Sequence, residues 1–269
     1  MTNPVLDDGW READAYEGFM GRWSRPLGSR FLDWLGIPRG AHWLEVGCGT
    51  GALTSSICEQ SAPGSVTACD SSAAFVAYCA AEVKGPGISI VVGGPGGLPR
   101  RRPGYDAVVS SLLLNFLPEP AVALSEMREH CVPGGCVAAS VWDYSDGMEF
   151  LRNFWDEAIV LDPTVRSLDE GERFPLCRPD ALRTLFEGAA FEGVTVATLT
   201  VPTHFATFED YWRPFTRGVG PAPRYLASLS APHRRALEAR LRSRLAPSGI
   251  ESIALSARAW AVRGGRAPA

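Results

Sequence analysis

Three glycines at alternate positions follow a short apolar segment that ends in an acidic residue. The acidic residue is Glu45, and the glycines are Gly47, Gly49 and Gly51. Glycine adopts positive φ angles and lets a ligand come close to the backbone. A helix that starts after such a turn offers unpaired amide groups and the positive end of its dipole. The spacing therefore predicts that a nucleotide-like ligand lies across a strand–helix turn.

A second carboxylate stands where the next strand is expected to end. Residues 65–69 are predicted to form a short buried strand, and Asp70 follows it. A carboxylate at the tip of the second strand can accept hydrogen bonds from both hydroxyls of a ribose. The glycines have the spacing Gly-x-Gly-x-Gly, whereas dinucleotide-binding enzymes use Gly-x-Gly-x-x-Gly. This difference argues against a nicotinamide oxidoreductase.

Together, these two features resemble motifs I and II of the class I S-adenosylmethionine (SAM)-dependent methyltransferases. Residues 105–112 are similar to the fourth strand of that family, and residues 132–137 are similar to the turn into its fifth strand. The chain most resembles the small-molecule enzymes of the family, the methyltransferase type 11-like group. The resemblance implies an enzyme that uses SAM as its cofactor and transfers a methyl group to an O, N or C atom of a small organic molecule.

The resemblance also implies which residues bind the donor. Glu45 would hydrogen-bond around its amino acid end, the glycines would follow its methionine and ribose parts, and Ser71 would line the adenine. The predicted cofactor-binding residues are Arg22, Trp23, Glu45, Gly47, Cys48, Gly49, Gly51, Asp70, Ser71, Gly94 and Ser111. Three structural alternatives stand beside these roles. Glu45 could cap its own turn, Asp70 could cap the next helix, and Trp23 could be a packing residue.

The chain departs from the family in the loop after the third strand. Many members carry Gly-Asp-Ala there, and the aspartate reads the adenine amino group. Here Gly94 occupies the place of the acid and brings no side chain, and Pro95 has no N–H group. Adenine recognition must then rely on other backbone groups, water or apolar contacts.

Methyl transfer from a sulfonium depends on alignment and exclusion of water, and such positioning can supply about 7–11 kcal/mol. The candidates for contact with the acceptor are Asn115, Asp143 and His204. Asn115 stands where relatives often carry a histidine, and it can orient a hydroxyl but cannot take its proton. Asp143 follows the fifth strand at the carboxyl edge of the sheet. His204 is the histidine best placed to act as a general base, because it lies just before the predicted lid.

Strands and helices alternate with short connections through the middle of the chain. Strands are predicted at residues 42–46, 65–69, 88–92, 106–110, 135–142, 194–201 and 252–262. Alternation of this kind gives a parallel sheet with helices on both faces. We predict an α/β, Rossmann-like seven-stranded methyltransferase sheet that is mostly parallel, with an antiparallel last strand and a helical lid insertion. Pro26 is expected to separate two N-terminal helices.

We predict that the chain has three parts. Residues 1–40 would form an N-terminal helical cap, residues 41–204 and 249–269 the SAM-binding domain, and residues 205–248 the substrate lid. An apolar fraction of 46% is sufficient for the core of such a domain.

The composition and net charge limit the kinds of partner that we expect. A net charge of −4 gives no basic field for a nucleic acid, and no apolar window is long enough to cross a membrane. Seven cysteines without C-x-x-C spacing indicate reduced thiols of a cytoplasmic protein. Cys131 and Cys136 flank a tight turn, so no metal site is expected.

We expect a monomer or homodimer with a small-molecule acceptor. The alternatives are a protein of this fold that binds SAM or a metabolite without methyl transfer, and a protein or RNA methyltransferase.

Overall fold

A single seven-stranded sheet organises the chain in the computed structural model, which describes residues 20–217, 220–247 and 252–268. The strand order is β3-β2-β1-β4-β5-β7-β6. The strands are β1 (His42–Val46), β2 (Ser65–Asp70), β3 (Ile88–Val92), β4 (Tyr105–Ser111), β5 (Cys131–Trp142), β6 (Glu192–Phe205) and β7 (Ile253–Gly265). Neighbouring strands from β3 to β5 are parallel, and β7 is antiparallel to both β5 and β6. The predicted Rossmann-like methyltransferase sheet with an antiparallel last strand is confirmed.

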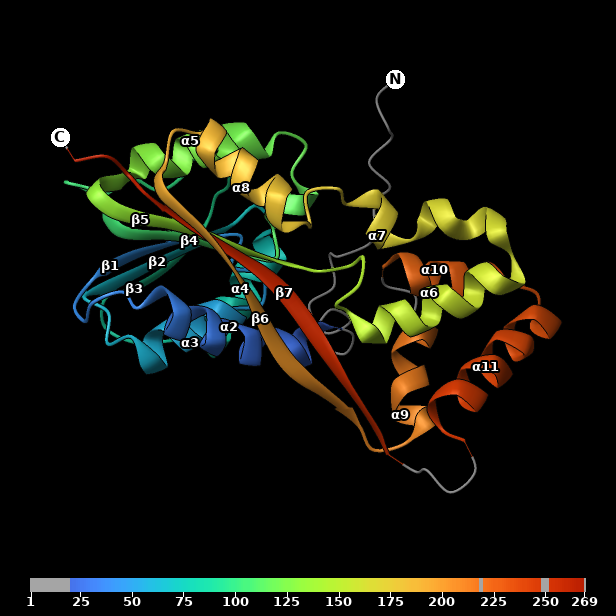
Figure 1. Ribbon diagram of the computed structural model, residues 1–269. Coiled ribbons are helices and arrows are strands. Elements are labelled where there is room, and N and C mark those ends of the chain that lie inside the picture. Colours follow the sequence, from blue (N-terminus) through green and yellow to red (C-terminus); the bar gives the residue numbers. More distant parts are fainter. Residues whose placement is uncertain (1–19, 218–219, 248–251, 269) are drawn as a thin grey trace.

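Helices cover both faces of this sheet (Figure 1). On one face lie α2 (Arg22–Leu35) and α3 (Ala52–Gln60), and on the other lie α5 (Pro120–His130) and α8 (Pro179–Gly188). Helix α4 (Ala73–Glu82) connects β2 to β3. The central strands are buried on both faces, as shown by Leu44 in β1 and Val108 in β4, neither of which is exposed. This burial explains why their sequences are nearly continuous apolar runs.

The expected break at Pro26 does not occur. Helix α2 runs through Pro26 without interruption, and its buried stripe includes Trp23, Leu27 and Phe31. Pro26 is near the start of the helix, where the loss of its amide removes a single hydrogen bond to the preceding turn. Packing of the stripe compensates for this loss. The first 19 residues of the predicted cap lie outside the described residues.

Strands β6 and β7 are longer than the sequence indicated and form an arm. The last residue of β5, Trp142, pairs with Ala259 of β7. Beyond that point β6 and β7 continue to pair with each other as far as Phe205 and Ile253. At about 3.3 Å per residue, the arm extends roughly 20 Å past the end of β5. In Figure 1 it runs away from the main sheet toward a separate group of helices.

The helical block at the end of the arm contains the predicted lid and one helix from outside it. Between β6 and β7 lie α9 (Phe208–Trp212), η4 (Arg213–Arg217), α10 (Pro221–Ser228) and α11 (Ala231–Leu245). Helix α6 (Glu149–Leu161) packs against them, and it is followed by η3 (Pro163–Leu168) and α7 (Glu170–Arg173). The short elements η3 and α7 were not predicted.

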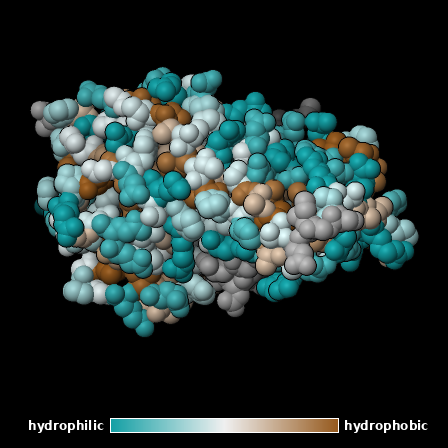
Figure 2. Space-filling view, turned by 60° about the horizontal axis from the view of Figure 1, so that its bottom comes forward, coloured by the Kyte–Doolittle hydropathy of each residue, from teal (hydrophilic) through white to brown (hydrophobic). Residues whose placement is uncertain are grey.

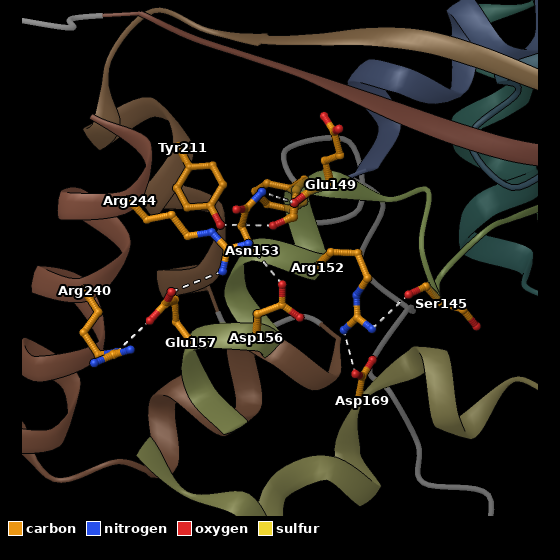
Figure 3. Close-up of polar contacts among 11 residues, drawn as sticks. Ser145, Glu149, Arg152, Asn153, Asp156, Glu157, Asp169, Tyr211, Arg240 and Arg244 are labelled. Atoms are coloured by element: carbon orange, nitrogen blue, oxygen red, sulfur yellow. Dashed lines mark hydrogen bonds and ion pairs between the residues drawn. The ribbon is translucent and has the colours of Figure 1, made fainter. Parts of the chain in front are cut away.

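Aromatic rings form the interior of this block, and ion pairs join its outer side. The rings of Phe150 and Phe154 each lie 4.5 Å from the ring of Phe215. On the outside of α6, Glu157 accepts hydrogen bonds from Arg240 at 2.6 Å and Arg244 at 3.2 Å (Figure 3). The ring stack, rather than these exposed pairs, supplies most of the stabilisation, because exposed ion pairs contribute little.

The surface is mainly polar. Figure 2 shows a largely hydrophilic face on which hydrophobic residues form small, separate groups. Within the part of the chain that the structure describes, no helix is both long enough and apolar enough to span a bilayer.

Candidate functional site

The three glycines after β1 all adopt positive φ, at +78° for Gly47, +51° for Gly49 and +88° for Gly51. A Cβ atom on Gly47 would lie 2.6 Å from the side chain of Leu113, and one on Gly51 would lie 2.6 Å from the Sγ of Cys79. A Cβ atom on Gly49 would meet no atom within 4 Å. Gly47 and Gly51 are therefore required by the packing of the turn. Gly49 faces open space, where a ligand can approach the backbone.

Asp70 is fixed against this turn at the end of β2. Its Oδ2 accepts a hydrogen bond from the Gly49 amide at 3.0 Å, and its Oδ1 accepts one from the Ser72 amide at 2.9 Å. The residue that caps α4 is Ser72, whose hydroxyl accepts from the Phe75 amide. Each carboxylate oxygen retains a lone pair after these bonds. The structure thus provides two oriented acceptors at the carboxyl edge of the sheet.

Glu45 ties β1 to α3. It is 1% exposed, and its Oε2 accepts a hydrogen bond of 2.6 Å from the Thr54 hydroxyl. Burial away from water raises the pKa of Glu45 to about 8, although the bond from Thr54 acts in the opposite direction. The neighbouring Cys48 is buried too, and its thiol shares a hydrogen bond with Cys79 that holds the pKa of Cys48 far above its usual range. The contact that the structure shows for Glu45 is with Thr54, which joins β1 to α3. The role of Glu45 toward a donor stays a prediction.

The loop after β3 is held by a residue that sequence reasoning missed. The carboxylate of Glu126, on α5, accepts hydrogen bonds from the amides of Gly96 at 2.5 Å and Leu98 at 2.9 Å. Glu126 lies in a polar stretch that reads as a solvent-facing helix surface, so no local signal marked it. The loop is therefore a fixed structure although it is rich in glycine.

The two bonds to Glu126 leave one backbone amide of the loop after β3 without an acceptor. The amide of Gly93 donates to the Asp70 carbonyl at 3.0 Å, and the amide of Gly97 donates to the Gly94 carbonyl at 3.0 Å. Among the described residues, the amide of Gly94 has no acceptor. A Cβ atom on Gly94 would lie 3.6 Å from the Cβ of Ser71, which is exposed. Gly94 and Ser71 are thus neighbours beside Asp70, and their contact with an adenine stays a prediction.

The segment after β4 reaches the same edge. The hydroxyl of Ser111 bonds that of Ser140 at 2.9 Å, and the Leu112 amide donates to the Ser140 carbonyl at 2.7 Å. Leu112 adopts a φ of +60°, which is unusual for a residue with a side chain. The Nδ2 of Asn115 is buried, and within the described residues it has no hydrogen-bond partner. An unsatisfied buried amide of this kind is available to a ligand.

Arg22 and Trp23 connect α2 to the arm. Arg22 donates to the His204 carbonyl at 2.8 Å and lies 3.3 Å from the Asp210 carboxylate. The Trp23 ring is buried, with its centroid 5.0 Å from that of Phe150. Trp23 is therefore a packing residue, and Arg22 contacts β6 and α9. A contact of either residue with the donor stays a prediction.

The structure also changes two assignments at the acceptor side. Asp143 is 2% exposed and forms an ion pair with Arg258, in which Nη2 and Oδ2 are 2.5 Å apart. It lines a cleft of about 770 Å³ together with Arg152 and Asp169, and none of the predicted donor residues lines that cleft. Two nitrogens of Arg258, Nε and Nη2, contact the same Oδ2 of Asp143, so the guanidinium occupies this oxygen. His204 is exposed near the tip of β6, so neither residue is placed as a general base.

The described residues contain no group of three or more side chains that could bind a metal ion.

Comparison with known proteins agrees with this geometry. Residues 44–135 match the family model described as a methyltransferase domain. A search of curated proteins finds no match. Among solved structures, a protein from Anabaena variabilis described as a methyltransferase of an antibiotic biosynthesis pathway has a TM-score of 0.59 at 16% identity. The alignment covers 88% of this chain and 96% of that protein.

Two further structures share the fold. Phosphoethanolamine N-methyltransferase 2 of Haemonchus contortus, in complex with phosphomonomethylethanolamine and S-adenosylhomocysteine, has a TM-score of 0.58 at 15% identity, covering 98% of this chain and 59% of its own. A protein from Bacillus halodurans described as a methyltransferase has a TM-score of 0.56 at 14% identity. The alignment covers 88% of this chain and 97% of that protein.

The fold, together with the glycine turn and the carboxylate of Asp70 beside it, is that of the Rossmann-like methyltransferases. Residues 44–135 match a methyltransferase domain, and the chain shares the fold of solved methyltransferases, in agreement with the resemblance of its sequence motifs. The Haemonchus contortus enzyme is also known in complex with S-adenosyl-L-methionine.

Proposed function

We propose that the protein is a SAM-dependent methyltransferase that transfers a methyl group to an O, N or C atom of a small organic molecule. The observation that carries this proposal is the contact between Gly49 and Asp70. The Gly49 amide fixes the Asp70 carboxylate beside a turn whose glycine faces open space. This arrangement joins a backbone surface for the donor to two acceptors for its ribose hydroxyls.

The residues present fit SAM. Asp70 would accept the ribose hydroxyls, the backbone at Gly49 would follow the methionine part, and the unused Gly94 amide would bind the adenine beside Ser71. The Gly94 amide thus replaces the side chain that many members of the family use. When bound, SAM supplies a methyl group already activated by the positive charge of its sulfur.

The chain contributes positioning rather than strong base catalysis. The unpartnered Nδ2 of Asn115 would donate a hydrogen bond to an oxygen or nitrogen of the acceptor. The helices at the end of the arm would exclude water from the acceptor, which is the role that we assign to the lid. Orientation of this kind is sufficient for a large acceleration when the donor is already reactive.

Calorimetric titration of the protein with SAM, S-adenosylhomocysteine and NAD tests the donor site. We expect micromolar binding of both sulfur ligands and no binding of NAD. The variant Asp70→Ala should weaken SAM binding at least tenfold, whereas Asp33→Ala, at an exposed acidic residue of α2, should leave it unchanged. Failure of the natural protein to bind either sulfur ligand refutes the proposal.

A second candidate is a protein that binds SAM or a metabolite on this fold without methyl transfer. It is favoured by the loss of the adenine-reading acid at Gly94 and by the ion pair that occupies Asp143. Incubation with SAM and a panel of small amines, phenols and carboxylic acids distinguishes the two. Methylated product, detected as a mass increase of one methyl group, supports the transferase. The net charge of −4 makes RNA a poor acceptor, and a protein acceptor would appear as a methylated polypeptide in the same assay with cell extract.

A further inference from the structure

Glu170 is a buried carboxyl that the donor site does not use. It lies in α7 and is 3% exposed, and its Oε2 accepts a hydrogen bond from the indole Nε1 of Trp155 on α6. In the described part of the chain, no basic side chain forms an ion pair with it. Its neighbour Asp169 is paired with Arg152 at 2.6 Å (Figure 3). A buried carboxyl without a paired cation is costly, and such groups often have a ligand.

The side chain of Glu170 lies on the inner face of α7. The Phe174 amide donates to the Glu170 carbonyl at 3.0 Å, so the two residues are one helical turn apart and share a face. The Phe174 ring lies 5.1 Å from the ring of Phe116 and 5.4 Å from that of Tyr144. Gly171 and Glu172 of α7 line the 770 Å³ cleft beside Asp143 instead.

This inner face covers the carboxyl ends of the central strands. Phe116 ends the short helix η2 (Leu114–Phe116) after β4, and Tyr144 follows β5. Asn115, whose Nδ2 has no partner among the described residues, immediately precedes Phe116. On the other side of η2, Leu113 packs at the position where Gly47 would carry a Cβ. The donor turn, Asn115 and the aromatic rings therefore follow one another along the same edge.

The groups at this edge match one kind of acceptor. Faces of aromatic rings attract cations, and a buried carboxylate needs a positive partner. We infer that Glu170 binds the amino group of a small amine acceptor whose cationic form is surrounded by aromatic rings. This inference rests on the proposed function and names its acceptor class. Asn115 would bind a second, oxygen-bearing group of the same molecule.

The same carboxyl can prepare the amine for reaction. An ammonium group gives one proton to the Glu170 carboxylate, which leaves a neutral amine with a free lone pair and a neutral carboxylic acid. Burial raises the pKa of Glu170 to about 7, and Asp169 acts in the same direction, whereas the hydrogen bond from Trp155 and the charge of Arg173 lower it. A carboxyl with a raised pKa accepts this proton more readily than an ordinary glutamate.

Titration calorimetry with benzylamine, on protein saturated with S-adenosylhomocysteine, tests this assignment. Benzylamine stays cationic from pH 5.5 to 8, so a change in affinity reports the protein. We expect binding to strengthen roughly tenfold or more across this range as Glu170 ionises. Benzyl alcohol, the neutral analogue, should bind weakly and without this pH dependence. Glu170→Gln should weaken benzylamine binding at least tenfold at pH 8, and Glu172→Gln, an exposed residue of the same helix, should not.

Several outcomes would overturn the assignment. Equal benzylamine affinities for the Glu170→Gln and natural proteins would do so, as would benzylamine binding no tighter than benzyl alcohol. If the variant does not fold, a flat pH profile of the natural protein decides against the assignment. Titration of the same samples with S-adenosylhomocysteine separates the two proposals. Loss of that binding refutes the donor site, whereas intact binding without a preference for the amine refutes Glu170 alone.

Discussion

The buried carboxyl of Glu45 predicts that the protein becomes less stable as the pH rises. In the unfolded chain this group has a pKa near 4.5, and burial raises the pKa to about 8 in the folded protein. Between these two values the unfolded carboxyl is ionised while the folded one remains protonated. The folded state therefore binds more protons, and the free energy of unfolding decreases with increasing pH.

The size of the effect follows from the pKa shift. Each pKa unit corresponds to about 1.4 kcal/mol, so the loss between pH 5.5 and pH 8 amounts to up to about 3 kcal/mol. The variant Glu45→Gln keeps the shape of the side chain, and its amide oxygen can still accept the hydrogen bond from Thr54. It cannot ionise. The stability of the variant relative to the natural protein should therefore increase with pH by a similar amount.

Urea unfolding, followed by tryptophan fluorescence at pH 5.5, 6.5, 7.5 and 8, measures this difference. The comparison is made between two proteins at each pH, so the contribution of Glu170, which has the same sign, cancels. The m-values must agree for the free energies to be compared. Two stability curves that run parallel across the pH range would falsify the argument, because they would show that Glu45 ionises alike in both states.

Two further substitutions test contacts that hold the site. Glu126→Gln keeps one acceptor for the loop after β3 and loses the charge, so SAM affinity should fall roughly three- to tenfold in calorimetry. Glu129→Gln, at an exposed residue of the same helix, is the control, and equal loss in both variants would exclude the clamp. Arg258→Met leaves the Asp143 carboxylate buried without its cation and should cost about 3–5 kcal/mol in urea unfolding. Adding Asp143→Asn should recover part of that loss, and a double variant as unstable as the single one contradicts the ion-pair account.

The glycine turn beside Asp70 could be predicted from sequence because its determinants are local. Gly47, Gly49 and Gly51 are needed for the turn itself, and the turn brings the Gly49 amide to Asp70. The alternation of strand and helix segments likewise predicted a mostly parallel sheet with helices on both faces. Each of these features depends on residues close together in the chain or on the regular β-α-β connection.

The acceptor side could not be predicted, since its contacts join distant segments. Asp143 was a reasonable candidate by its place after β5, but its partner Arg258 is 115 residues further along the chain. Glu170 lies in a polar acidic stretch that resembles an exposed loop, and only the packing of α6 and α7 buries it. The length of the β6–β7 arm had no signal either, because strand alternation does not show where pairing ends.

Because the glycine turn and the edge formed by η2, α6 and α7 are packed differently, they should tolerate substitutions differently. The donor turn is packed so tightly at Gly47 and Gly51 that any side chain there would displace Leu113 or Cys79. The acceptor edge is assembled from η2, α6 and α7, which meet through aromatic rings and a single carboxyl. Rings and a carboxyl can be exchanged without disturbing the turn, so the acceptor can differ between proteins that keep the same donor. Glu170 is therefore the position at which a change of charge should alter acceptor choice while donor binding remains intact.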